Sequence, residues 1–480
     1  MPLLSPTVAD LIGTARLARI AVDRAEAEAL QVTVRELLAS FTTVQEYQPE
    51  RPGGATPARA APLCPQPRQV AITETSGPWQ LRYRIEEHAG PLTGTTLAVK
   101  DCIAISGVPL SLGLRGIRYR PRCDAAVIHL LVNAGAALAG TSTCEALCLS
   151  GGSHTAATGP LGNPYDPGRS SGGSSSGSAV LAALGVVDVA IGTDQAGSVR
   201  IPGAWCGIYG LKPTWGAVPY DGAFSIHPRL DHIGLLARDP NRLAAAWSVL
   251  RNQPDRPADQ PPGRVALLRE GFDRPESEPD VDIHVYRLAE RLTRMGITVE
   301  EASVPLHDPA SDAVTVLALT GLADMLTASD DDAGPLAGLA AVVAGVLRRP
   351  DRPVTVMASV LAALWARQAG LNDRVARAQT LGNRASAAYD QVLARADAIL
   401  LPTVPMTATP LPSAGAPPSE LVRLGRGASR NTAPFNLTGH PAITVPCPTA
   451  GLPVGAMLIA RHGGDDLLVR LAGRLGRTPA

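Results

Sequence analysis

The first part of the chain carries apolar side chains at helical spacing. One face of the expected helix would hold Leu30, Val34, Leu37, Leu38 and Phe41. Apolar residues three and four positions apart form one stripe on a helix, so the pattern predicts amphipathic helix over residues 8 to about 46. Six prolines between Pro49 and Pro67 then interrupt regular structure and indicate a linker.

From residue 97 onward, short apolar runs alternate with helical segments. The runs expected to form strands are residues 97–105, 136–139, 186–192, 263–269, 297–300, 397–405 and 456–460. Helices are expected at 127–135, 178–184, 282–294 and from Asp465 onward, with Asp124 as the cap of the first. This alternation is typical of an α/β protein with a largely buried sheet, and we find no internal repeat.

The pattern divides the chain into three parts. Residues 1–80 are expected to form an N-terminal helical region with the proline-rich linker, and residues 81–305 and 391–480 the α/β core. Residues 306–390 carry mostly helical patterns and are expected to form a helical insertion.

Composition and charge narrow the class of protein. With 45% apolar and 18% charged residues, the chain of 480 residues is globular rather than disordered. Lys+Arg and Asp+Glu number 43 each, which gives no electrostatic reason to expect a nucleic acid or membrane partner. No secretory signal is expected, and the longest apolar run, residues 335–347, is too short to span a bilayer. Seven cysteines, an odd number, favour buried free thiols in a reducing cytoplasm.

Lysine is almost absent from the chain. Only Lys100 and Lys212 are lysines among the 43 basic residues, and the others are arginines. Arginine supplies charge but cannot give up its proton in a protein, whereas lysine can. Either the two lysines are remnants of a codon bias, or one of them does chemistry that arginine cannot do.

The segment Ser170–Pro202 is rich in serine and glycine. A phosphate-binding loop would need a lysine after its glycines, and none follows. Residues 173–177 match G-x-S-x-G, but Pro and Gly residues stand where a nucleophile elbow needs a buried strand. The interpretation as a flexible linker is also disfavoured, because a helix and a buried strand are expected to follow directly.

A second turn, Thr193–Ser198, follows that strand. Successive backbone N–H groups in a tight turn form an anion site, so a serine at its end would lie beside an oxyanion hole. Asp194 either fixes this turn by accepting backbone N–H groups or is an exposed turn residue.

Residues 172–214, GGSSSGSAVLAALGVVDVAIGTDQAGSVRIPGAWCGIYGLKPT, closely resemble the signature region of the amidase signature family of serine hydrolases. LTGTTLAVKDCIAISGVP (92–109) resembles the lysine-bearing strand of that family. The likeness extends through five more segments: NPYDPGRSSGGSS, VPYDGAFSIHPRLDHIGLLARD, LLREGF, NTAPFNLTGHPAITVP and GLPVGAMLIARHGGDD. The last pieces look most like the branch of bacterial broad-specificity, often enantioselective, amidases. The resemblance covers residues 90–305 and 395 to the end. It implies a central mixed twisted sheet flanked by helices, with the insertion on the substrate side.

The resemblance also implies the roles of single residues. The lysine base matches Lys100, the cis-serine that relays the proton matches Ser174, and the nucleophile matches Ser198. The amides of the oxyanion hole match those of Gln195, Ala196, Gly197 and Ser198. Supporting roles fall to Ser175, which would hydrogen-bond the lysine, to Asp194, and to Arg200, which would anchor the loop by an ion pair. Lys212 is expected to be structural. Ser176 and Ala196 replace glycines that are usual in the family.

A lysine base has a physical requirement. A serine hydroxyl attacks poorly until a base removes its proton. A lysine serves only if its pKa falls from about 10.4 to roughly 7–8, a shift of about 4 kcal/mol, which burial on an apolar strand would supply.

The resemblance therefore implies an amidase: acylation of the nucleophilic serine, release of ammonia or an amine, and hydrolysis by water. An amide synthase or acyltransferase would use the same acyl-enzyme, and a glutaminase subunit of a tRNA-dependent amidotransferase is the second alternative. A binding protein without activity is the least favoured, because the base, relay and nucleophile are all present.

No metal and no organic cofactor is expected. Cys144 and Cys148 lack a second ligand pair at zinc spacing, and His154 is not needed by the family. The expected partners are a small amide and a second copy of the chain in a homodimer, with no nucleic acid and no membrane. The N-terminal helices are expected to mediate self-association rather than to complete the active site.

Overall fold

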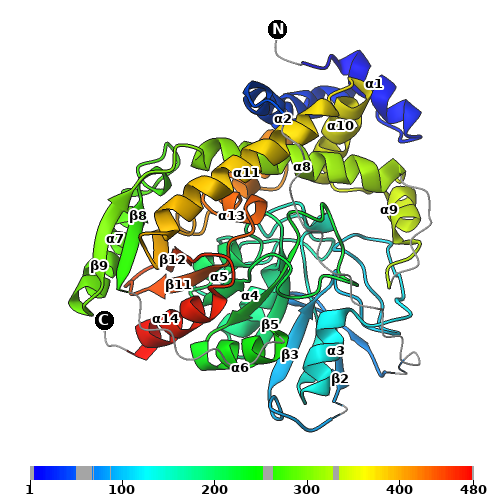
Figure 1. The fold of residues 1–480 in the computed structure, drawn as a ribbon. Coiled ribbons are helices and arrows are strands. Elements are labelled where there is room, and N and C mark those ends of the chain that lie inside the picture. Colours follow the sequence, from blue (N-terminus) through cyan, green and yellow to red (C-terminus); the bar gives the residue numbers. More distant parts are fainter. Residues whose placement is uncertain are drawn as a thin grey trace.

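The computed structural model describes residues 5–49, 68, 70–86, 88–251, 263–327 and 335–477. Within these residues a mixed sheet has the strand order β1-β2-β4-β3-β5-β7-β6-β11-β12-β10-β8-β9 (Figure 1). Its strands are β1 (Thr73–Glu74), β2 (Trp79–Ile85), β3 (Thr96–Lys100), β4 (Ala137–Ser142), β5 (Val189–Asp194), β6 (Tyr209–Lys212), β7 (His232–Ala237), β8 (Arg264–Leu268), β9 (Thr298–Ala302), β10 (Ala398–Pro402), β11 (Ala442–Cys447) and β12 (Val454–Ile459). The α/β class and the mixed sheet expected from the sequence are confirmed.

Parallel pairing occurs in two places, β4-β3-β5 and β10-β8-β9, and the remaining pairs are antiparallel. Parallel strands need a crossover, which helices supply here. The crossovers contain α3 (Ala126–Asn133) between β3 and β4, α4 (Ser176–Ala183) between β4 and β5, and α7 (Pro279–Arg294) between β8 and β9. These are the helices that the alternating pattern predicts.

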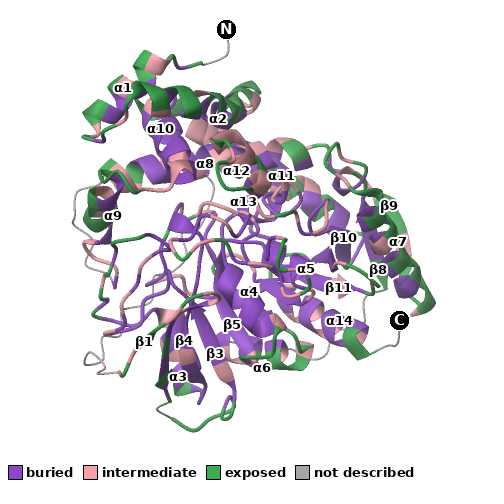
Figure 2. Ribbon diagram, turned by 180° about the vertical axis from the view of Figure 1, so that it is seen from behind, coloured by how far each residue is buried: buried purple, intermediate pink, exposed green. Residues whose placement is uncertain are grey.

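The two faces of the sheet are both covered. Ala190 and Leu236 pack with α4 on one face, whereas Ile191 and Leu235 face the larger core on the other. Side chains along a strand alternate between faces, so a strand buried on both sides reads as a continuous apolar run. Helix α5 (Arg200–Trp205) contacts β6, β11 and β12, and α6 (Pro240–Leu250) and α14 (Asp465–Arg477) pack on one another and on the sheet. Figure 2 shows the buried strands β3 and β5 beside the buried helix α4.

The helices at the start of the chain pack on those of the middle. They are α1 (Val8–Leu17), α2 (Arg24–Thr43), α8 (His307–Thr327), α9 (Leu339–Leu347), α10 (Val354–Gln368) and α11 (Asp373–Leu393), which Figure 1 shows gathered mostly on one side of the sheet. Helix α2 contacts α8 and α10 and buries the predicted apolar face there. Asp23 caps α2 by accepting the backbone N–H of Glu26 at 2.8 Å, which divides the expected helix in two. The expected linker lies almost entirely outside the described residues, and the three-part division of the chain stays a prediction.

Short elements complete the description. They are α12 (Pro418–Gly427), α13 (Pro434–Leu437) and the 3₁₀ turns η1 (Val44–Glu46), η2 (Ala146–Cys148) and η3 (Arg269–Gly271). Among the described residues, α8 is the one helix that is by itself long and apolar enough to cross a bilayer, and α10 with α11 would qualify as a bent pair. More than half of the apolar stretch of α8 is buried inside the molecule, as in an ordinary core helix.

Three local expectations need correction. Asp124 does not cap α3, whose N-cap is Ala125. Its buried carboxylate instead pairs with Arg68 at 2.6 Å and accepts the backbone N–H of Ser106 at 2.8 Å. Strand β5 continues to Asp194 rather than ending at residue 192, because its ladder with β7 extends that far. Five cysteines are free and buried as expected (Cys102, Cys144, Cys148, Cys206 and Cys447), but Cys123 forms a disulfide.

Candidate active site

Lys100 is the last residue of β3, and its side chain is fully buried. Its Nζ donates to Ser174 Oγ at 2.8 Å and to Thr193 Oγ1 at 2.9 Å. The peptide bond between Gly173 and Ser174 is cis. The structure therefore brings the lysine of one strand against the first serine of the Gly-Ser loop, 74 positions along the chain.

Ser175 joins this loop to the next one. Its backbone N–H donates to the carbonyl oxygen of Ser198 at 3.2 Å. Its hydroxyl donates to the carbonyl oxygen of Thr193 at 3.2 Å, and Lys100 Nζ lies 3.5 Å from the same oxygen. Ser175 and Lys100 thus share an acceptor on β5, and Ser175 does not hydrogen-bond the lysine directly as the resemblance implied.

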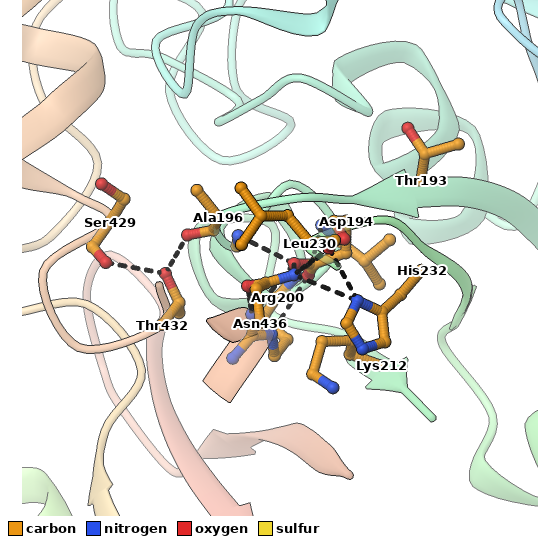
Figure 3. A network of polar contacts seen from close by, with 12 residues as sticks. Thr193, Asp194, Ala196, Arg200, Lys212, Leu230, His232, Ser429, Thr432 and Asn436 are labelled. Atoms are coloured by element: carbon orange, nitrogen blue, oxygen red, sulfur yellow. Dashed lines mark hydrogen bonds and ion pairs between the residues drawn. The ribbon is translucent and has the colours of Figure 1, made fainter. Parts of the chain in front are cut away.

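Asp194 holds the turn after β5 in place (Figure 3). Its carboxylate accepts the backbone N–H of Gly197 at 2.8 Å and of Val199 at 3.1 Å. It also pairs with Arg200 at 2.9 Å, and Asn436 Nδ2 donates to it at 2.9 Å. Asp194 is therefore a buried anchor rather than an exposed turn residue, and the ion pair with Arg200 is confirmed. Burial alone would raise the pKa of the Asp194 carboxyl, but the Arg200 guanidinium and Asn436 hold it below its usual range.

The amides of this turn are not equivalent. The N–H of Gly197 is used by Asp194, so it does not point at a substrate as expected from the resemblance. The N–H groups of Gln195, Ala196 and Ser198 have no acceptor within the described part of the chain. Thr432 Oγ1 donates to the carbonyl oxygen of Ala196 at 2.6 Å and orients this peptide (Figure 3). Three amides therefore remain to bind an anion.

Gly197 has a backbone conformation that other residues rarely adopt. Its φ is +130°, and a Cβ there would lie 2.2 Å from Thr432 Oγ1. Glycine is needed at this position both for the dihedral angle and for the close approach of Thr432. Ala196, where the family usually has glycine, still offers its N–H and lines the cavity described next.

Ser198, Gln195 and Ala196 line a cavity with about 1020 Å³ of space, part of it open to solvent. Most of the wall is apolar and includes Leu37, Leu149, Ile226, Val314, Leu319 and Leu421. The described residues that line it include no Asp or Glu, and Arg426 is the one charged side chain among them. Because Leu37 belongs to α2, the N-terminal helices do form part of the cavity, contrary to the expectation from the sequence.

Three thiols surround Lys100 and change its proton affinity. Burial lowers the pKa of Lys100, but the neighbouring Cys148 thiol, whose own pKa is lowered, favours the ammonium when it is ionised, and the net pKa of Lys100 lies above its ordinary value. The pKa of the Cys148 thiol is held well below its usual value by hydrogen bonds from Cys102 and Cys144 and by Lys100. Burial alone therefore does not produce the lowered lysine pKa expected from the sequence. A neutral amine at Lys100 would form if the ammonium passed its proton to the Cys148 thiolate.

Lys212, the second lysine, has different surroundings. It is fully buried, and its Nζ donates to the carbonyl oxygen of Pro213 at 3.0 Å. Burial and the nearby Arg200 charge lower its pKa well below the ordinary value. His154, the other rejected candidate, contacts the carbonyl oxygen of Gly152 at 2.9 Å and does not line the cavity.

Sequence reasoning missed four residues that shape the site. They are Thr193, Cys148, Thr432 and Asn436. Thr432 and Asn436 both lie in NTAPFNLTGHPAITVP, a segment that the resemblance includes without assigning it a role. A signal was therefore present for these two, whereas the thiol cluster becomes visible only in three dimensions.

A buried lysine hydrogen-bonded to a serine, with a second serine and backbone amides nearby, is the arrangement used by the serine hydrolases that have lysine in place of histidine. The Amidase family matches residues 78–469. The chain therefore belongs to the amidase family and is an amidase enzyme.

Relatives and solved structures agree with this family. The chain is 36% identical over 478 residues to the enantioselective amidase of Rhodococcus rhodochrous, covering 92% of this chain and 89% of that protein. It is 30% identical over 411 residues to a glutamyl-tRNA(Gln) amidotransferase subunit of Methanosarcina mazei, covering 81% of this chain and 85% of that protein.

Two solved structures have the same fold. A crystal structure of an amidase aligns with a TM-score of 0.68 and 24% identity, over 98% of this chain and 94% of that one. The peptide amidase PAM, in complex with the competitive inhibitor chymostatin, aligns with a TM-score of 0.65 and 26% identity, over 81% and 84%.

Proposed function

We propose that this enzyme hydrolyses small primary carboxamides with an apolar acyl group, aliphatic or aryl, and releases ammonia. The observation that carries the proposal is the 2.8 Å contact between Lys100 Nζ and Ser174 Oγ, next to the Ser198 loop, where three amides have no acceptor among the described residues. The apolar wall of the cavity beside Ser198 suits an uncharged acyl group.

The reaction would proceed through an ester on Ser198. Ser198 Oγ attacks the amide carbonyl while Ser174 takes its proton and passes its own to the neutral amine of Lys100. The N–H groups of Gln195, Ala196 and Ser198 stabilise the oxyanion that forms. Return of the proton through Ser174 to the amide nitrogen breaks the C–N bond and releases ammonia. Water then attacks the ester by the same proton path and frees the carboxylic acid and the serine.

The relative from Methanosarcina mazei raises the glutaminase alternative. Glutamine would bring an α-ammonium and an α-carboxylate into the cavity, and a buried charge is costly unless a partner meets it. The described lining residues supply no acidic partner for the ammonium. We therefore favour an uncharged amide as the substrate over glutamine.

A panel of aryl and alkyl carboxamides and glutamine, assayed for ammonia, tests the proposal. Each reaction is repeated with hydroxylamine as an alternative acyl acceptor. We expect ammonia from apolar amides, no turnover by Ser198→Ala, and little change in Ser176→Ala, a buried serine at the start of α4. Activity on glutamine alone would favour the glutaminase, and acyl transfer without hydrolysis would favour the synthase.

Assembly and location are further parts of the proposal. We propose a homodimer, and light scattering of the full chain at the mass of a monomer would contradict it. A cytoplasmic location stays a prediction from the cysteine pattern. The disulfide at Cys123 weakens the argument, because disulfides are rare in reducing compartments.

A further inference from the structure

Three potential metal ligands meet away from the cavity: Asp390 on α11, His440 just before β11, and His462 between β12 and α14. One ligand atom from each lies within 4.8 Å of the other two. The His440 ring is buried, whereas Asp390 and His462 are 53% and 42% exposed. Neither the cavity lining nor the proposed reaction includes them.

His462 presents a lone pair to a carboxylate. Its Nε2 lies 2.9 Å from the carbonyl oxygen of Thr438, which can only accept, so Nε2 carries the hydrogen. In the neutral ring Nδ1 then has the lone pair, and this atom lies 4.0 Å from Asp390 Oδ1. Two electron-rich atoms that face each other at this distance are stabilised by a cation between them.

His440 completes the set from the other side. Its Nε2 lies 3.2 Å from Asp390 Oδ1, and its Nδ1 lies 2.9 Å from the hydroxyl of Thr438. In the tautomer with its hydrogen on Nδ1, the Thr438 hydroxyl accepts that hydrogen and Nε2 has a lone pair for a metal, whereas in the other tautomer Nε2–H donates to Asp390 Oδ1. Thr438 thus holds the outer nitrogens of both rings, the kind of support that orients metal-binding histidines in proteins.

We propose that Asp390, His440 and His462 bind a divalent transition metal ion, with Zn²⁺ the best match. Zinc bonds to imidazole nitrogen and carboxylate oxygen are about 2.0–2.2 Å long, so tetrahedral ligand atoms lie about 3.3–3.6 Å apart. The His440 and His462 nitrogens lie 3.2 and 4.0 Å from Asp390 Oδ1, and the two nitrogens lie within 4.8 Å of one another, so the half-exposed His462 would have to move inward to complete the site. Water would fill the open position, because two of the three ligands face solvent.

The site would tie α11 to the C-terminal strands, since its ligands come from distant parts of the chain. Its role is therefore stabilisation of the fold rather than the reaction. The sequence analysis expected no metal site, and no two of these residues stand at a spacing typical of zinc ligands.

The test uses the full chain after removal of metal with a chelator. Equilibrium dialysis and calorimetry with Zn²⁺, and visible absorption with Co²⁺, are measured for the wild type, Asp390→Asn and His462→Gln. The matched control is His88→Gln, an exposed histidine outside the cluster. We expect one bound ion, Co²⁺ bands, and a melting temperature raised by Zn²⁺. In both ligand variants binding should weaken by on the order of 10-fold or more, as seen when support of a metal site is lost, while the control binds as the wild type does.

Less than one equivalent bound by the wild type, or unchanged affinity in both ligand variants, would overturn the proposal. These readouts do not use amide turnover, so they are independent of the proposed reaction. We also expect the initial rate of amide hydrolysis at 25 °C to be the same before and after metal removal.

Discussion

Replacement of Lys100 separates a proton-transfer role from a structural one. Its Nζ touches Ser174 and Thr193 in a site with no solvent exposure. Methionine has a similar length but cannot accept a proton, and arginine keeps the charge but stays protonated. We therefore expect Lys100→Met and Lys100→Arg to lose activity to a similar extent.

The expected loss is large in rate and small in stability. Losing a general base typically costs about 10²–10⁴ in rate, which corresponds to roughly 3–5 kcal/mol of transition-state stabilisation. Lys100→Met leaves the Ser174 and Thr193 hydroxyls without their buried partner, at about 1–3 kcal/mol. Removal of a buried amine in favour of an apolar side chain offsets part of this cost.

Lys212→Met is the matched control, because Lys212 is equally buried but donates to the Pro213 carbonyl and not to a reacting group. Turnover of one amide is measured for each purified variant, with circular dichroism and thermal melting as checks of folding. A folded Lys100→Arg enzyme that keeps a third or more of wild-type turnover would refute the lysine-base mechanism. Equal losses in the Lys100 and Lys212 variants would refute the assignment of the base to Lys100.

Three further predictions concern buried ionisable groups. Cys148→Ser removes the thiol that raises the lysine pKa, so the acidic limb of the pH profile of kcat/KM should move to lower pH. Cys206→Ser, which changes a buried thiol elsewhere, should leave that limb where it is. An unchanged limb in Cys148→Ser would contradict the coupling between Cys148 and Lys100. Asp194→Asn leaves the Arg200 charge unpaired in the interior and should lower the free energy of unfolding, measured in urea, by about 3–5 kcal/mol. A change below about 1 kcal/mol would show that the ion pair does not hold the turn. Burial raises the pKa of Asp231 to about 7, so between pH 4 and 7 the folded chain binds one more proton at this group than the unfolded chain does. The free energy of unfolding therefore falls by about 1.4 kcal/mol for each unit by which the pH rises in this range. Asp231→Asn should reduce that slope, as measured by urea unfolding at several pH values, and an identical slope would exclude Asp231 as its source.

Local patterns in the sequence were sufficient for the elements of the fold. The apolar face of residues 30–41 and the strand–helix alternation after residue 97 both appear in the structure, since periodicity depends on near neighbours. Lys100, Ser174 and Ser198 were identified by resemblance, and the structure brings their segments together. Their catalytic roles stay predictions.

Contacts between distant segments were decided only by the tertiary structure. Asp124 has the position of a helix cap, yet Arg68, 56 residues earlier, takes its carboxylate. Gly197 has the position of an oxyanion amide, yet the buried Asp194 uses its N–H.

The same holds for groups that no single motif contains. The thiols around Lys100 and the cluster of Asp390, His440 and His462 come from separate elements. Burial and proximity set the pKa of a side chain and its capacity to bind a metal. Both depend on which parts of the chain pack together, and a local pattern of residues carries no record of that packing.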